Sequence, residues 1–212
     1  RLWSVNELEA FWAALWDFFE IKSSTPYQAV IDRPVMPGAK WFEGARLNFA
    51  EHVLRNAHSS GPAILFASET RPLTEISWAV LVRDVARVAA ALRERGIAPG
   101  DRVVAFMPNI PETMVACLAA LSIGAIWSSC STDFGAASVL DRFQQIEPKA
   151  LFTVDGYTYG GKAFDRRAEA RTIIDGLPTL EHVFSLDYLE PGAMPAVVNG
   201  ETWAALIESR SE

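Results

Sequence analysis

The sequence predicts an α/β fold, with a doubly wound, mostly parallel sheet flanked by helices. Short apolar runs follow one another after Gly100, and they are continuous where a half-exposed strand would alternate. Continuous runs are typical of parallel strands that are covered on both faces. Helical patterns separate the runs, so we expect right-handed crossovers between the strands. The predicted strands are residues 103–107, 125–129, 150–154 and 182–186.

The residues before the sheet are predicted to form helical and extended pieces. Ser4 and Glu7 have the spacing of a capping box, which predicts a helix that runs to about Glu20. Residues 21–47 are interrupted by prolines and show no clear period, so we expect an extended connector there. Asn48 is expected to cap a short helix that follows it.

A hairpin and a long helix lead into the sheet. Residues 62–67 and 73–77 flank a turn, which predicts a β-hairpin. Ser77 is expected to cap a helix over 78–95, and Gly96 is expected to end it in a left-handed conformation. Later helices are predicted at 111–122, 136–146, 165–174 and 203–207.

We therefore expect three regions along the chain. Residues 1–60 form a helical and extended N-terminal segment that packs on the main domain, and residues 61–190 form the α/β subdomain. Residues 191–212 are interpreted as a connector toward a part of the protein that lies downstream. Because the chain opens on Arg1 and shows no complete phosphate-binding or catalytic motif, it is interpreted as the N-terminal part of a larger enzyme.

Composition excludes several classes of function. The 212 residues include 19 Lys and Arg against 26 Asp and Glu, a net charge of −7, which argues against general binding of nucleic acid. No apolar run has the length of a membrane span and no signal peptide opens the chain, so we expect neither a membrane role nor secretion. Cys117 and Cys130 lack the spacing of a metal site. A reducing cytoplasm is the expected compartment.

One segment imitates a phosphate-binding loop. Residues 156–163 fit the spacing G-x-x-x-x-G-K after a predicted strand, but Ala163 stands where a hydroxyl would hold Mg²⁺. One hypothesis is a stand-alone nucleotide-binding or interaction module built on this loop. The favoured interpretation is that Gly156, Gly160 and Gly161 simply allow the chain to turn.

Two arginines share one face of the helix predicted over 78–95. Arg83 and Arg87 are four residues apart, so their guanidinium groups can meet one phosphate with several donors. The competing interpretation is a solvated helix face with a local ion pair between Asp84 and Arg87.

A turn rich in hydroxyl groups follows the strand predicted at 125–129. Ser131, Thr132, Asp133 and Gly135 lie where a doubly wound sheet places its ligand contacts, at the carboxyl end of a strand. Gly135 is expected to supply an unusual backbone angle, and Asp133 is expected to cap the next helix.

Several segments together resemble a known enzyme family. Residues 40–48, KWFEGARLN, precede GDRVVAFMPN at 100–109 and IGAIWSSCS at 123–131. This series resembles the adenylate-forming acyl-CoA synthetases, and the run 124–135 is similar to the branch that activates acetoacetate. The resemblance covers nearly the whole chain from Trp41 onward. Thr132 departs from the proline expected at that position of the branch.

The resemblance implies a two-step ligase. The longer parent protein would use ATP and Mg²⁺ to convert acetoacetate into an acyl-adenylate, and the thiol of CoA would then displace AMP to give acetoacetyl-CoA. An acetyl- or other short-acyl-CoA synthetase is the alternative within the family. The catalytic and metal-binding motifs of the family do not occur in residues 1–212, so this chain alone is expected to be inactive.

The resemblance also implies roles for the candidate residues. Arg83 is the first choice, and Arg87 the second, for contact with the adenosine phosphate of CoA. Ser131, Thr132, Asp133 and Gly135 are expected to line the route of the pantetheine arm or to support the acyl pocket. No catalytic residue and no metal ligand is assigned to this chain.

Overall fold

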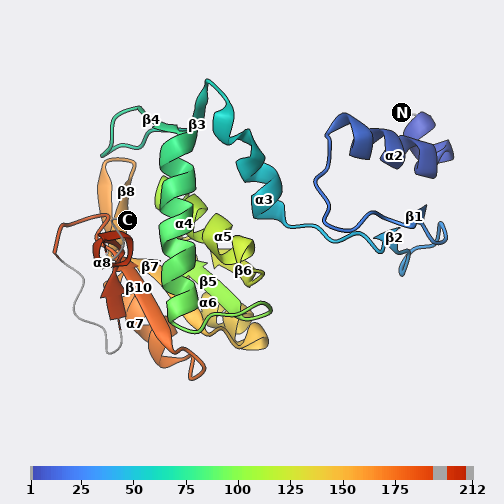
Figure 1. The fold of residues 1–212 in the computed structure, drawn as a ribbon. Helices are drawn as coiled ribbons and strands as arrows, with labels where there is room; N and C mark the ends of the chain where they lie inside the picture. The colour runs from blue at the N-terminus through green and yellow to red at the C-terminus, as the bar shows by residue number, and fades with distance from the viewer. Residues whose placement is uncertain (1, 193–199, 209–212) are drawn as a thin grey trace. The chain divides into compact units, whose positions relative to one another are not determined.

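A computed structural model of the protein describes residues 2–192 and 200–208. The chain divides into two compact units, Arg1–Arg55 and Asn56–Glu212, each with its own internal packing (Figure 1). Of the predicted connector at 191–212, residues 193–199 and 209–212 lie outside the described residues. The rest of that region contributes a short strand and a short helix to the second unit.

The first helix of the N-terminal unit is broken, so the predicted capping box is wrong. Helix α1 spans Trp3–Asn6 and helix α2 spans Leu8–Phe18, with Glu7 between them in a non-helical conformation (φ −127°, ψ 61°). Ser4 lies inside α1 and not before it, so it does not occupy the capping position. Ser4 and Glu7 have the sequence spacing of a capping box, but the backbone leaves the helical conformation at Glu7, which should be the third residue of the capped helix.

The segment predicted as an extended connector contains a small antiparallel pair. Strand β1 (Ala29–Ile31) pairs with strand β2 (Trp41–Glu43), and the rings of Trp16 and Phe42 pack with centroids 4.7 Å apart. Strands of three residues are too short to show a period in the sequence. Helix α3 (Phe49–Leu54) follows, and the Asn48 side chain accepts a hydrogen bond from the Glu51 amide at 3.1 Å, which confirms the predicted cap.

The second unit is built on a five-stranded parallel sheet, which confirms the predicted fold class. Every predicted strand is present, and the short strand β11, which the sequence did not reveal, pairs with β10 at one edge. The strands stand in the order β11-β10-β7-β5-β6. Their bounds are β5 Arg102–Phe106, β6 Ile126–Cys130, β7 Ala150–Val154, β10 His182–Leu186 and β11 Gly200–Thr202.

Helices cover both faces of this sheet, as a doubly wound fold requires. On one face α4 (Trp78–Glu94) packs against α5 (Pro111–Ser122) and α8 (Trp203–Glu208), and Figure 1 shows α4 in front of the strands. On the other face α6 (Ala136–Phe143) packs against α7 (Arg167–Asp175), and the short 3-10 helix η2 (Gln144–Ile146) follows α6 directly. A second 3-10 helix, η1 (Arg55–His58), lies in the chain between α3 and β3. The chain runs outward from β5 to β6 and then returns past β5 to β7. The direction of winding therefore reverses between β5 and β7.

The core lies on both sides of the central strands. Phe106 of β5 and Phe143 of α6 are fully buried in a cluster beneath α6 and α7. Phe152 of β7 and Phe184 of β10 are buried on the opposite face, with ring centroids 4.8 Å apart. Each such side chain contributes about 2–3 kcal/mol relative to an exposed one, so these four rings help to hold the sheet to the helices on its two faces.

The elements that lead into the sheet follow the predictions closely. Strands β3 (Pro62–Phe66) and β4 (Thr74–Ser77) form the expected hairpin. The Ser77 hydroxyl accepts a hydrogen bond from the Val80 amide at 3.3 Å, which confirms the cap of α4. Gly96 ends that helix with φ +73°, as predicted.

Candidate functional site

The candidate site lies at the carboxyl edge of the sheet, where doubly wound folds bind their ligands. The predicted turn 131–135 follows β6, and α5 begins just after β5. A second hairpin, β8 (Gly156–Tyr159) and β9 (Lys162–Asp165), follows β7 at the same edge. Residues 187–192 leave the carboxyl end of β10 beside it. The fold therefore gathers four connections around the place where the winding reverses.

The turn after β6 has a different internal structure from the one expected. The Ser131 hydroxyl donates to the Asp133 carboxylate, and this bond holds the pKa of Asp133 below its usual range. Gly135 occupies the N-cap position of α6 with φ −68° and ψ 151°, a conformation open to any residue. No side chain caps α6, so the predicted roles of Asp133 as a cap and of Gly135 as a special backbone angle are both wrong.

Thr132 is the buried residue of this turn. It is only 1% exposed, whereas Ser131 and Asp133 on either side are exposed. Phe134 is the next residue of the turn, and the guanidinium carbon of Arg142 lies 4.6 Å from the centre of its ring. The turn thus presents one hydroxyl and one carboxylate to solvent, a set that suits N–H and O–H groups of a ligand.

The arginines of α4 are arranged differently from the predicted local pair. The Arg83 Nε donates to Asp84 Oδ1 at 2.8 Å, so the expected pair between Asp84 and Arg87 is wrong. This bond raises the pKa of the Arg83 guanidinium, whose side chain is 53% exposed. The Arg87 side chain makes no hydrogen bond or ion pair within residues 2–192 and 200–208, and the residue is half-buried.

The two groups of predicted site residues are not joined by direct contacts. In the described part of the chain, no hydrogen bond or ion pair connects Arg83 or Arg87 with Ser131, Thr132, Asp133 or Gly135. A ligand that touches both groups would have to span them.

The segment that imitates a phosphate loop is the turn of the β8–β9 hairpin. Gly160 and Gly161 have φ +59° and +70°, and their amides donate to the two carboxylate oxygens of Glu69, at 2.7 Å each. A phosphate loop leads into a helix, whereas this one leads into β9. The hypothesis of a nucleotide-binding module on this loop is therefore wrong. The interpretation as a simple turn is confirmed for Gly160 and Gly161 but is wrong for Gly156, which lies in β8 and has no left-handed φ.

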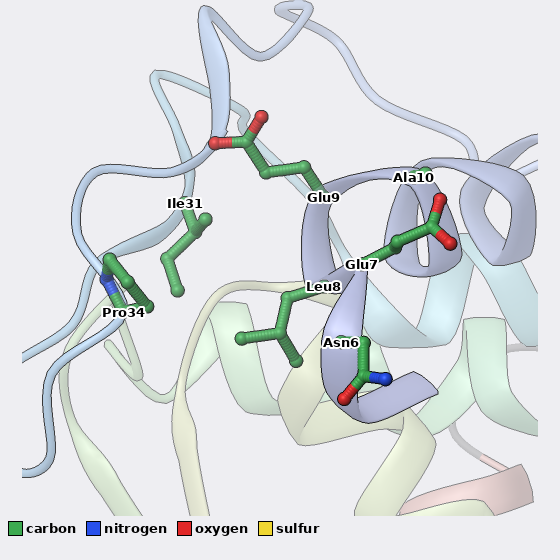
Figure 2. Close-up of a pocket in the computed structure, with 7 residues that line it drawn as sticks. All are labelled: Asn6, Glu7, Leu8, Glu9, Ala10, Ile31 and Pro34. Carbon is green, nitrogen blue, oxygen red and sulfur yellow. The ribbon is translucent and has the colours of Figure 1, made fainter. Parts of the chain in front are cut away.

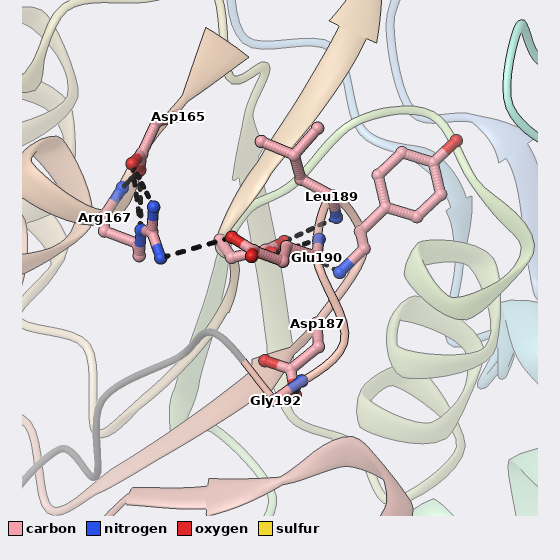
Figure 3. Close-up of polar contacts among 8 residues, drawn as sticks. Asp165, Arg167, Asp187, Leu189, Glu190 and Gly192 are labelled. Atoms are coloured by element: carbon pink, nitrogen blue, oxygen red, sulfur yellow. Dashed lines mark hydrogen bonds and ion pairs between the residues drawn. The ribbon is translucent and has the colours of Figure 1, made fainter. Parts of the chain in front are cut away.

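Asp155 is a residue at this edge that the sequence analysis missed. It follows β7, is 1% exposed, and accepts hydrogen bonds from the amides of Tyr188, Leu189 and Glu190 at 2.7, 2.8 and 2.7 Å. Figure 3 shows Leu189 and Glu190 in these contacts, with the ion pair of Arg167 and Asp165 beside them. A carboxylate directly after a fully buried strand was the signal in the sequence.

The pockets of the N-terminal unit contain none of the predicted site residues. One has a volume of about 430 Å³, and Figure 2 shows its lining. The lining includes the carboxylates of Glu7 and Glu9 and no Lys or Arg side chain, so this pocket offers no positive group to an anionic ligand. The lining residues are Asn6, Glu7, Leu8, Glu9, Ala10, Ile31 and Pro34.

Neither metal chemistry nor thiol chemistry is indicated by the described residues. They contain no group of three or more His, Cys, Asp or Glu side chains placed to hold a metal ion. Burial raises the pKa of the Cys117 thiol, which disfavours the reactive thiolate. No helix in the described ranges is both long and apolar enough to cross a membrane.

Comparison with known proteins connects the chain to an enzyme family. The family model described as AMP-binding enzyme matches residues 53–203, and the model described as acetyl-coenzyme A synthetase N-terminus matches residues 1–53. Acetoacetyl-coenzyme A synthetase of Rhizobium meliloti (strain 1021) is 43% identical over 207 residues, which are 97% of this chain and 31% of that protein. Acetoacetyl-CoA synthetase of Danio rerio is 42% identical over 190 residues, which are 88% of this chain and 28% of that protein.

A solved structure gives the same likeness in three dimensions. Acetoacetyl-CoA synthetase from Streptomyces lividans has a TM-score of 0.91 and 48% sequence identity, and the match covers 99% of this chain. It covers 32% of that protein. The chain thus spans less than a third of the length of the relatives it matches.

Proposed function

Since this chain belongs to the AMP-binding enzyme family, we propose that it is the N-terminal part of a ligase that forms acetoacetyl-CoA. The observation that carries the proposal is the likeness to acetoacetyl-CoA synthetases along almost the whole chain. In the first step the carboxylate of acetoacetate would attack the α-phosphate of ATP, which forms the acyl-adenylate and releases pyrophosphate. The CoA thiol would then attack the acyl carbon and release AMP. The first step creates a good leaving group, and the second retains its activation in a thioester.

In this proposal the chain supplies scaffold and CoA contacts. Residues 61–190 act as an α/β subdomain, residues 1–60 as the N-terminal segment, and residues 191–212 lead toward the remaining parts of the enzyme. ATP and Mg²⁺ would be held by those other parts. One observation supports this division: Glu69 already occupies the glycine turn that resembles a phosphate loop. Both cysteines are free thiols, which supports a reducing compartment such as the cytoplasm.

The acid specificity of the longer protein tests the proposed function. We expect acetoacetate to support pyrophosphate exchange and thioester formation at a rate about tenfold or more above acetate or butyrate, a difference of about 1.4 kcal/mol in the transition state. Residues 1–212 alone, as the control, should support neither step. Equal or faster turnover of acetate would favour the short-acyl alternative, and exchange by residues 1–212 alone would contradict the division of roles.

The arginines of α4 are proposed to bind the adenosine phosphate of CoA, with Arg83 before Arg87. In the longer protein, Arg83→Ala should raise the KM for CoA about tenfold, because one charged hydrogen bond to phosphate is lost. Pyrophosphate exchange, which precedes CoA binding, should be unchanged. Arg87→Ala should have a smaller effect in the same direction.

Two variants control for the side effects of this change. Arg93→Ala removes an exposed arginine from the last turn of the same helix and should leave the KM for CoA unchanged. Asp84→Asn removes the ion-pair partner of Arg83 but keeps the guanidinium. A KM for CoA that does not respond to Arg83→Ala would reject the assignment.

The turn of Ser131, Thr132, Asp133 and Gly135 is proposed to line the pantetheine arm or to support the acyl pocket, because it stands at the edge where such sheets bind ligands.

A further inference from the structure

One short turn contacts three separate connections at the carboxyl edge of the sheet. We call residues Ser68–Pro72, at the tip of the β3–β4 hairpin, the clamp turn. The Glu69 carboxylate accepts hydrogen bonds from Gly160 and Gly161, as described above. Figure 1 shows the two hairpins at the same end of the second unit. This first contact binds the clamp turn to the connection that follows β7.

Arg71 joins the clamp turn to two other connections. Its Nη1 donates to Glu112 Oε1 at 2.7 Å, and Glu112 lies in the first turn of α5, after β5. Its guanidinium carbon lies 4.5 Å from the centre of the Tyr188 ring, after β10. The Tyr188 hydroxyl also lies 3.2 Å from Ser68 Oγ. The segments that leave three adjacent strands, β10, β7 and β5, therefore meet on one turn.

The ion pair in this cluster is partly withdrawn from water. The side chain of Arg71 is 35% exposed and that of Glu112 is 18% exposed, and Glu112 Oε2 is buried without a hydrogen-bond partner among the described residues. A carboxylate in this position depends on its single cation, since removing one member of a buried pair leaves the other uncompensated. Loss of Arg71 should therefore disturb α5 as well as Tyr188.

The clamp turn is itself closed by internal hydrogen bonds. The Ser68 amide donates to the Arg71 carbonyl at 2.9 Å, and the Arg71 amide donates to Ser68 Oγ at 3.1 Å. Glu69 and Arg71 are therefore held in a fixed relation to each other. A disturbance at one side chain is transmitted to the other through a short, rigid piece of backbone.

We propose that the clamp turn is a conformational device that holds these three connections as one cooperative unit. When the contact of Glu69 with the glycine turn opens, the contacts of Arg71 with Glu112 and Tyr188 open with it. Two of the three connections follow β5 and β7, the strands between which the winding reverses, so the unit opens in a single step beside that point. The device stands on contacts within the second unit and does not depend on which acid the enzyme uses.

Amide hydrogen exchange in the protein, read residue by residue by NMR, tests this cooperativity. Glu69→Gln should speed exchange at Gly160 and Gly161 about tenfold, because one N–H then faces an amide group instead of a carboxylate oxygen. The decisive result is at a distance. Arg71→Met removes a side chain that contacts neither glycine, yet it should speed exchange at Gly160 and Gly161 by a similar factor. Because both contacts close the same unit, the double variant should speed exchange by about the product of the two factors.

Controls separate the device from general loosening. Glu75→Gln makes the same chemical change on an exposed residue of the same hairpin and should alter none of these rates. The amides of Leu151 and Phe152, in buried β7, should stay unchanged in all variants. If Arg71→Met fails to fold, Tyr188→Phe takes its place, because it removes only the hydroxyl group. It should then speed exchange at Gly160 and Gly161 in the same direction and by a smaller factor. Changes confined to each variant's own contact would overturn the proposal.

Discussion

Asp155→Ala is expected to lower the free energy of unfolding by about 4 kcal/mol, because it leaves three inward-facing amides without an acceptor. The carboxylate of Asp155 is almost wholly buried and accepts from the amides of Tyr188, Leu189 and Glu190. These amides belong to the segment that leaves β10, which has no regular secondary structure to satisfy them. Urea unfolding followed by circular dichroism measures the change.

Two further variants give this prediction its contrast. Asp155→Asn keeps an acceptor oxygen of the same shape and should cost about 2 kcal/mol, roughly half as much. Asp175→Asn changes an exposed carboxylate that pairs with Arg171 on the surface of α7, and it should cost less than about 0.5 kcal/mol. An unfolding free energy for Asp155→Ala within about 1 kcal/mol of the wild-type value would show that water replaces the carboxylate and that the account is wrong.

Gly156→Ala is expected to lower the free energy of unfolding by about 3 kcal/mol through a steric clash with backbone. A Cβ atom at this position would overlap the carbonyl oxygen of Phe164 and would lie 2.7 Å from Leu189 Cδ2. Gly156 pairs with Asp165 across the β8–β9 hairpin, so the strands cannot separate without loss of the pairing. The same urea measurement applies.

The matched control for this change is Gly61→Ala. A Cβ atom at Gly61 meets nothing within 4 Å, and the residue precedes β3 on the surface. Alanine there should leave stability within about 0.5 kcal/mol of the wild type, or raise it slightly by restricting the unfolded chain. If both variants behaved alike, the close approach of the two strands at Gly156 would not be a constraint on the fold.

These two neighbouring residues make the end of β7 the most constrained point of the candidate site. Asp155 orders the segment after β10, and Gly156 permits the hairpin to approach that segment closely. Both follow β7, one of the two strands between which the winding of the sheet reverses. In the longer enzyme, substitutions here should reduce the amount of folded protein and leave the KM for CoA of the folded fraction unchanged.

Several local features could be predicted from single stretches of sequence. The caps at Asn48 and Ser77 and the left-handed glycine at Gly96 were correct because the chemistry that decides them lies within a few residues. The capping box at Ser4 failed because the backbone bends at Glu7, where two short helices meet. The same limit explains the turn after β6, in which Asp133 takes its partner from Ser131 and leaves α6 uncapped.

The contacts that shape the site were beyond such reasoning. The hydrogen bond between Glu69 and Gly160 joins residues that are 91 positions apart in the sequence. The bond between Arg71 and Glu112 spans 41 positions, and the bond between Tyr188 and Ser68 spans 120. The glycine turn carried the composition of a phosphate loop, and only its pairing as a hairpin and its contact with Glu69 decided otherwise. Asp155 gave a local signal, but its partners are in a segment more than thirty residues away.

By itself, the sequence determined the order along the chain of the four long strands of the sheet and of the helices between them, and it determined the parallel, doubly wound class. A buried strand must be apolar on both faces, and that requirement is written in consecutive residues. Tertiary structure alone decided which polar groups meet at the carboxyl edge. Hydrogen bonds and ion pairs act over about 3 Å, and residues come that close only after the chain has folded.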